Sequence, residues 1–200
     1  MSDSTLQRAN DRLASHLHGT VLTANIVVPN RTQEYWGQDL PLPFLNDCYD
    51  WVVCNPTTSQ ASTWLREMAR VAQHVAFWDI VASGHAKAEP YISAFERLRH
   101  PTRARVRSLR TWLALFEKTG LVVEHHYLID EVVNLNQWAL KTVPIFWKDE
   151  TSLVLQRLQA MVVQAPAPVQ DWLAPQLPLE GSGEAIQFTR HFALIIGRRA

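Results

Sequence analysis

The stretch from residue 49 to residue 81 places the strongest constraint on how this chain can fold. Residues 49–55, YDWVVCN, and residues 74–81, HVAFWDIV, are short runs of β-branched and aromatic residues that predict two buried strands. The residues between them begin with Thr and Ser, which favour helix caps, and place four apolar side chains on one helical face: Trp64, Leu65, Met68 and Val71. A strand, helix and strand in this order predict two parallel strands joined by a right-handed crossover, and therefore an α/β fold.

The same patterns predict further elements on both sides of this unit. Before it, we expect a helix over residues 4–18, with Ser4 as N-cap and Gly19 as C-cap, and strands over residues 20–28 and 33–38. After it, we expect helices over residues 91–100 and 109–119, the second capped by Ser108 and ended by Gly120. A strand over 121–129, a mainly helical insertion at about 131–174 and a last strand over 191–199 complete the chain.

Size and charge predict one globular domain over residues 1–200. Hydrophobic residues make up 47% of the chain, and 19 basic residues balance 19 acidic ones, so the chain lacks the basic excess of a nucleic-acid-binding protein. No apolar run approaches the roughly 18 to 20 residues of a membrane span, and the first residues lack the apolar core of a signal peptide. We therefore expect a cytoplasmic protein that binds neither nucleic acid nor membrane.

Cysteine and tryptophan usage adds two expectations. Cys48 and Cys54 are the only cysteines, and no second pair accompanies them to complete a metal site. We interpret them as reduced, with a disulfide between them as the less favoured alternative, and we expect no metal. The eight tryptophans are spread along the chain, which is typical of core packing, although a pocket for a flat apolar ligand is the alternative.

Several short motifs occur in an order that resembles one protein family. They are GQDLPLPF at 37–44, YDWVVC at 49–54, REMARV at 66–71, WDIV at 78–81, ERLRHPTR at 96–103, and IQFTR at 186–190 followed by ALIIGRR at 193–199. This pattern resembles the class I S-adenosylmethionine-dependent methyltransferases, particularly the ubiquinone and menaquinone methyltransferase group (methyltransferase type 11). The resemblance implies a Rossmann-like sheet, mostly parallel with an antiparallel C-terminal strand, that is flanked by helices.

The chain departs from the family pattern where that family binds its cofactor. The family has a glycine-rich turn after its first strand, because only glycine lets the backbone approach the cofactor closely, and this chain has no such turn. If residues 20–28 correspond to the second strand, Asn25 stands where the family has a ribose-binding carboxylate, and the first, central strand is missing. If they correspond to the first strand, Pro29 stands in the turn, and the second strand and its helix are missing.

By resemblance, four residues would contact S-adenosylmethionine. Asp39 would accept a hydrogen bond from the adenine amino group, Leu40 would pack on the adenine ring, and Cys54 and Asn55 lie at the carboxyl end of a strand, where ligands of α/β sheets bind. The alternatives are that Asp39 forms a turn, that Cys54 is a small core residue, and that Asn55 begins a turn.

The histidines give weaker signals. Adjacent residues of a strand face opposite sides, so we expect one of His125 and His126 to be buried and the other exposed. His85 could act as a base in the loop that contains it, but a solvated loop histidine is the more common case.

Together these features predict a degenerate, incomplete methyltransferase-like protein. We interpret it as a pseudoenzyme without independent activity that binds a small apolar ligand or completes an assembly. A homodimer or a heteromer with a methyltransferase-type partner would cover the exposed edge of the incomplete sheet. The alternative is an active S-adenosylmethionine-dependent methyltransferase of a small apolar or aromatic substrate, with an atypical or partner-completed cofactor site.

Overall fold

The computed structural model of the chain describes residues 3–24, 32–35, 40–55, 60–101, 105–140, 151–178 and 185–200. These residues belong to two compact units. Unit 1 comprises Met1–Ile80, Leu109–Ile129 and Phe192–Ala200, and unit 2 comprises Val81–Ser108 and Asp130–His191.

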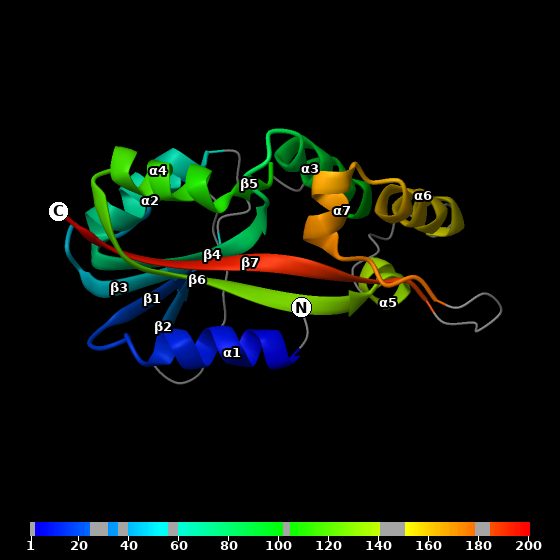
Figure 1. Cartoon of the computed structure of the whole chain (residues 1–200). Coiled ribbons are helices and arrows are strands. Elements are labelled where there is room, and N and C mark those ends of the chain that lie inside the picture. Colours follow the sequence, from blue (N-terminus) through cyan, green and yellow to red (C-terminus); the bar gives the residue numbers. More distant parts are fainter. Residues whose placement is uncertain are drawn as a thin grey trace. The chain divides into compact units, whose positions relative to one another are not determined.

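Three strands follow the first helix, and strands and helices then alternate from β3 to α5 (Figure 1). The helices are α1 Asp3–Ala14, α2 Ala61–Val71, α3 Ala88–Arg99, α4 Leu109–Lys118, α5 Leu135–Leu140, α6 Thr151–Val163 and α7 Ala167–Leu173. The strands are β1 Val21–Ala24, β2 Thr32–Tyr35, β3 Tyr49–Cys54, β4 Ala72–Ala82, β5 Arg107–Ser108, β6 Leu121–Asn134 and β7 Gln187–Arg199.

The sheet confirms the predicted α/β fold with mostly parallel strands. Its strand order is β2-β1-β3-β4-β7-β6, with β5 paired separately to β4. The β1–β2, β1–β3, β3–β4 and β4–β5 pairs are parallel. Strand β7 runs antiparallel to β4, as the resemblance implies for the C-terminal strand.

In unit 1, helices cover both faces of the sheet. Helices α2 and α4 lie on one side of β3 and β4, and α1 lies on the other side of the strands (Figure 1). Phe77 of β4 packs on Trp112 and Phe116 of α4, with ring centroids 4.1 Å and 6.1 Å away. Leu65 and Met68 of α2 are fully buried, so the predicted apolar face of this helix lies in the core.

The core of unit 2 is built around three aromatic rings. Trp138 of α5 stacks on Phe95 of α3 with ring centroids 5.0 Å apart, and Phe188 of β7 meets both rings edge-on. Helix α3 begins at Ala88, ahead of Pro90, because proline is tolerated in the first turn of a helix, where its missing N–H has no partner.

Element ends differ from the predictions where backbone pairing or capping decides them. Gly120, with φ of +83°, follows α4 as predicted. Helix α1 ends at Ala14, four residues short of the predicted end, and Gly19 instead forms a separate turn with φ of +73°. Strand β6 has 14 residues and continues to Asn134, into the predicted helical stretch, because its neighbour β7, with 13 residues, pairs with it.

Candidate functional site

The carboxyl ends of β1 and β3 mark the candidate site, in unit 1. Ala24 at the end of β1 is in register with Cys54 at the end of β3. The connection after β1 leads to β2 on one side, and the connection after β3 leads to β4 on the other, so the chain leaves these two neighbouring strands in opposite directions. Open α/β sheets bind ligands beside the carboxyl ends of strands at such a switch point. We call the place formed by Thr23, Cys54 and Asn55 the switch-point site.

Two side chains at the switch-point site have buried polar atoms that the protein does not satisfy. Thr23 has no exposed surface, and neither its Oγ1 nor Oδ1 of Asn55 has a hydrogen-bond partner in the described part of the chain. Leaving such an atom unpaired costs about 1–3 kcal/mol, so most buried polar atoms have a partner. Oδ1 of Asn55 can accept a hydrogen bond and the Thr23 hydroxyl can donate or accept one, which suits a small polar group of a ligand.

Cys54 is part of the core. Its side chain is 1% exposed, and its Sγ donates to Sδ of Met68 on α2 at 3.0 Å. Burial, followed by the charge of Asp79, raises the pKa of the Cys54 thiol well above its usual value. The thiol therefore stays neutral and faces α2, and only the main chain of Cys54 is placed at the strand end. Cys48 and Cys54 are both free, as the prediction of reduced cysteines requires.

The loop before β3 carries the other two predicted cofactor residues. Asp39 lies outside the described residues, as do Asn25 and Pro29. Leu40 is the first described residue of this loop and is half-buried. That Asp39 and Leu40 contact adenine therefore stays a prediction, which rests on the resemblance.

Glu67 and Arg70 of α2 fix this loop in place. The Arg70 guanidinium donates to the carbonyl oxygens of Leu42 and Phe44 at 3.0 Å and 2.8 Å. Glu67 Oε2 accepts from the Leu42 N–H at 3.0 Å and from Nη2 of Arg70 at 2.8 Å. The hydrogen bonds from Arg70, together with the one from Leu42, lower the pKa of Glu67. We call this pair, with its bonds to the loop, the loop clamp.

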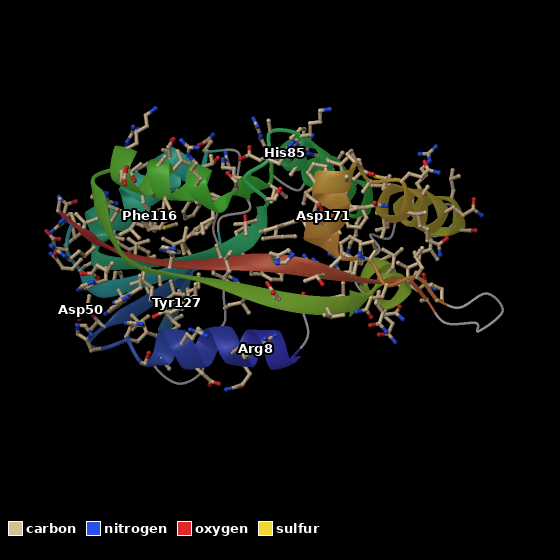
Figure 2. All side chains as sticks on the ribbon, in the orientation of Figure 1. Arg8, Asp50, His85, Phe116, Tyr127 and Asp171 are labelled. Atoms are coloured by element: carbon tan, nitrogen blue, oxygen red, sulfur yellow. The ribbon has the colours of Figure 1, made fainter. Side chains whose placement is uncertain are left out.

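A second polar contact joins β1 to β3 at their amino ends. Oδ2 of Asp50 accepts from the Thr20 N–H at 2.6 Å and from its hydroxyl at 2.8 Å. These bonds lower the pKa of Asp50, which Figure 2 labels at this end of the strands. Gly19 precedes the contact, and a Cβ at this position would collide with the Asp50 carboxylate.

The predicted histidine sites are not brought together as catalytic or metal-binding groups. His125 and His126 are both exposed, which corrects the prediction that one is buried, because β6 is the outermost strand of its side of the sheet. In the turn after β4, Nδ1 of His85 accepts from the Lys87 N–H at 3.2 Å. Among the described residues, no group of three or more His, Cys, Asp or Glu side chains could hold a metal ion.

Two polar anchors, which are ion pairs formed by residues of the family-like motifs, were not predicted from the sequence. The loop clamp comes from REMARV, where Glu67 and Arg70 have opposite charges three residues apart. In unit 2, Arg190 of IQFTR pairs with Glu96 of ERLRHPTR, although 94 residues separate them. The i, i+3 charge pattern could have indicated the first anchor. No local signal indicates the second.

No helix in the described ranges combines the length and apolar character that crossing a membrane would require.

Comparison with protein-family models gives no match, and comparison with curated proteins gives none.

Solved structures share the architecture over nearly the whole chain. A protein of Bacillus halodurans C-125 assigned as a methyltransferase aligns with a TM-score of 0.79 at 13% identity, covering 98% of this chain and 99% of that one. Geranyl diphosphate C-methyltransferase of Streptomyces coelicolor A3(2), solved with Mg²⁺, geranyl diphosphate and S-adenosyl-L-homocysteine, aligns with a TM-score of 0.51 at 10% identity, covering 97% and 78%.

A third match comes from a complex of the Haloferax volcanii methyltransferase activator Trm112 with a protein assigned as a methyltransferase. It has a TM-score of 0.52 at 14% identity and covers 97% of this chain and 88% of that one. Identities this low establish the fold alone. The chain therefore has the fold of S-adenosylmethionine-dependent methyltransferases.

Proposed function

We propose that this chain is a degenerate methyltransferase-like protein that does not transfer methyl groups on its own and serves as a ligand-binding or assembly module. The observation that carries the proposal is the connection between β1 and β2. Only seven residues, 25–31, separate these two parallel strands.

A connection of this length has no room for the family's cofactor-binding elements. Parallel neighbours usually need a crossover of about a dozen residues or more, most often with a helix. No glycine occurs between Gly19 and Gly37, so the glycine-rich turn has no counterpart after β1. The residues present therefore do not fit the methionine end of S-adenosylmethionine, and we derive no methyl-transfer step for this chain.

The position of β1 supports one of the two alignments with the family. Strand β1 is the immediate neighbour of β3, inside the sheet. This position agrees with residues 20–28 as the family's first strand, in which case the second strand and its helix are the missing parts. Pro29 then stands in the turn, where it lacks the backbone N–H that could bind the cofactor.

The family-like motifs that remain serve the scaffold. Glu67 and Arg70 hold the loop before β3, and Arg190 holds Glu96 inside unit 2. Neither anchor needs a cofactor in order to stabilise the fold, so a chain that no longer binds S-adenosylmethionine would still need these residues to fold.

Ligand binding is supported by the switch-point site. Its Thr23 and Asn55 offer buried polar atoms that have no hydrogen-bond partner among the described residues. Leu22 and Val53, their near neighbours in the sequence, are buried apolar residues. A small, largely apolar ligand with one or two polar groups would satisfy these atoms.

Assembly is supported by the edge of the sheet. Strand β6 is the terminal strand on its side, and Val122 and Leu128 are 43% and 50% exposed along it in unit 1. Unpaired edge strands with exposed apolar residues favour association. We therefore propose a homodimer or a heteromer with a methyltransferase-type partner.

The second candidate function is an active methyltransferase whose cofactor site a partner completes. The protein of the Haloferax volcanii complex, which shares this fold, is solved together with an activator. In this case the partner would supply the contacts that the seven-residue connection lacks.

Calorimetric titration of the purified chain with S-adenosylmethionine and with S-adenosylhomocysteine separates the two functions. We expect no saturable heat at cofactor concentrations up to about 1 mM, which corresponds to less than about 4 kcal/mol of binding free energy. Micromolar binding would overturn the non-catalytic proposal. In that event Asp39→Ala tests the predicted adenine contact, with Asp47→Ala as a control from the same loop. Light scattering after size-exclusion chromatography tests the assembly proposal, and a stable monomer would contradict it.

A further inference from the structure

Four of the chain's eight histidines gather in unit 1, at the end of α1 that meets the sheet. His16 follows α1, His18 lies two residues further on, His74 is on β4 and His125 is on β6. The His16 and His125 rings are 4.7 Å apart between centroids, and those of His18 and His74 are 5.7 Å apart. We call these four residues the histidine cluster.

Contacts link the histidine cluster to both α1 and the sheet. Nε2 of His16 lies 3.2 Å from the hydroxyl of Tyr127, which Figure 2 labels on β6 above α1. His74 stacks on Trp51 with ring centroids 4.5 Å apart, and its Nδ1 is 3.6 Å from Oε2 of Glu124. His16 is therefore a direct side-chain link between the end of α1 and β6.

The charged groups named around the cluster are two arginines and two carboxylates. On α1, the Arg12 guanidinium lies 4.7 Å from the centre of the Tyr127 ring, and on β7, Arg198 donates to Glu124 at 3.1 Å. The negative groups that face the cluster are Glu124, which His74 and Arg198 share, and Asp50, which Thr20 engages. Positive charge added to the cluster therefore lies beside two arginines, and among the described residues Glu124 and Asp50 are the carboxylates that face it.

The described side chains of α1 provide few buried contacts against this repulsion. Among the side chains of α1 that the structure describes, only Leu13 is buried, and Gln7, Arg8, Asp11 and Arg12 are exposed. Elements with few buried apolar contacts open at low free-energy cost. We therefore expect a small electrostatic change to shift the docking of the described end of α1, residues 11–14.

The described residues of the cluster do not form a metal site, so protonation is the chemistry left to them. We propose that the histidine cluster is a pH-sensitive latch, which holds α1 on the sheet at neutral pH and releases it in mild acid.

The direction in which pH changes the docking of α1 follows from the pKa of His16. Burial, then the charge of His125, lower the pKa of His16 against an opposing effect of Glu124. The docked state therefore prefers neutral His16. Docking is at full strength above the ordinary histidine pKa of 6.5 and weakens as the pH falls through and below that value.

Hydrogen exchange of the full chain, read by mass spectrometry at pH 7.5, 6.5 and 5.5, tests the latch. Protection factors, corrected for the intrinsic pH dependence of exchange, should fall about two- to fivefold in residues 7–16 at pH 5.5, the size typical of a partly exposed charge pair. Residues of β4 should keep their protection. His16→Gln and His125→Gln should each remove most of the pH dependence, because either change removes the closest like-charge pair.

His126→Gln is the matched control, since His126 is the exposed neighbour of His125 on β6 and lies outside the cluster. It should retain the wild-type pH dependence. Two results would overturn the latch: equal protection of α1 at pH 7.5 and 5.5 in the wild type, or a pH dependence that both His16→Gln and His125→Gln preserve.

Discussion

Arg190 donates from Nη1 to Oε2 of Glu131 at 3.1 Å inside unit 2. Its Nη2 donates to Oε1 of Glu96 at 3.2 Å, and the three side chains are 6%, 0% and 1% exposed. One guanidinium therefore ties β7 to β6 and to α3. Charges this deeply buried are tolerated because they are paired, and the loss of one member weakens the pairing of the others.

Replacing Arg190 by methionine should destabilise the protein strongly. Arg190→Met keeps much of the side-chain volume but leaves Glu96 and Glu131 buried without their shared cation, which should cost about 3–5 kcal/mol of unfolding free energy. Urea unfolding followed by circular dichroism measures the loss. Arg105→Met is the control, because Arg105 pairs with Glu89 while it is 60% exposed, and exposed pairs contribute about 1 kcal/mol or less. Equal losses in the two variants would contradict this account.

The loop clamp gives a second prediction. Arg70→Met removes the donors to Leu42 and Phe44, so we expect a loss of about 1–2 kcal/mol, at the lower end for charged hydrogen bonds because Arg70 is partly exposed. Proteolysis within residues 42–46 should also become faster. Arg66→Met, an exposed position on the same helix, is the control and should change neither property. Unchanged proteolysis in Arg70→Met would show that the loop keeps its conformation without the clamp.

Glu67 predicts a stability loss in acid. Its pKa in the folded state lies below the ordinary value of 4.5, so the unfolded chain takes up a proton more readily. The contribution of Glu67 to stability is therefore complete above pH 4.5 and is lost as the pH falls below that value through the lower pKa of the folded state. Glu67→Gln should flatten the fall in urea midpoint between pH 6 and pH 3.5, whereas Glu117→Gln, an exposed position on α4, should not. Parallel pH curves for Glu67→Gln and the wild type would refute this assignment.

Gly19 gives the fourth prediction. Alanine at this position would have to adopt φ of +73° and place its Cβ against the Asp50 carboxylate, disturbing the hydrogen bonds from Thr20. We expect Gly19→Ala to cost about 1–3 kcal/mol, within the range for strained backbone positions. Gly84→Ala should stay within about 0.5 kcal/mol, because no atom lies within 4 Å of a Cβ there. A thermal-denaturation midpoint for each variant checks the contrast.

The periodic parts of the fold could be predicted from the sequence. Strands β3 and β4 and the apolar face of α2 follow directly from alternation and helical spacing. The length of β6 could not be predicted, because pairing with β7, more than fifty residues away, decides where this strand ends.

The candidate site shows the same division between local and distant information. The strand ends that carry Cys54 and Asn55 could be predicted from the order of elements. That Cys54 faces Met68, and that Oδ1 of Asn55 has no hydrogen-bond partner among the described residues, depends on three-dimensional packing. The ion pairs of Arg190 depend on residues that are 59 and 94 positions away, so no local pattern could reveal them.

The short connection between β1 and β2 also offers a site at which a longer segment could be inserted by protein engineering. Its seven residues join two strands whose partners are already fixed, so inserted chain would add little closure entropy, about 0.6 kcal/mol for each doubling of length. A glycine-rich turn, a helix and one further strand could be grafted between Ala24 and Thr32. This graft would test whether the retained framework can bind S-adenosylmethionine again. The affinity of such a chimaera for S-adenosylmethionine would show how far the retained strands and loops can still form a cofactor site.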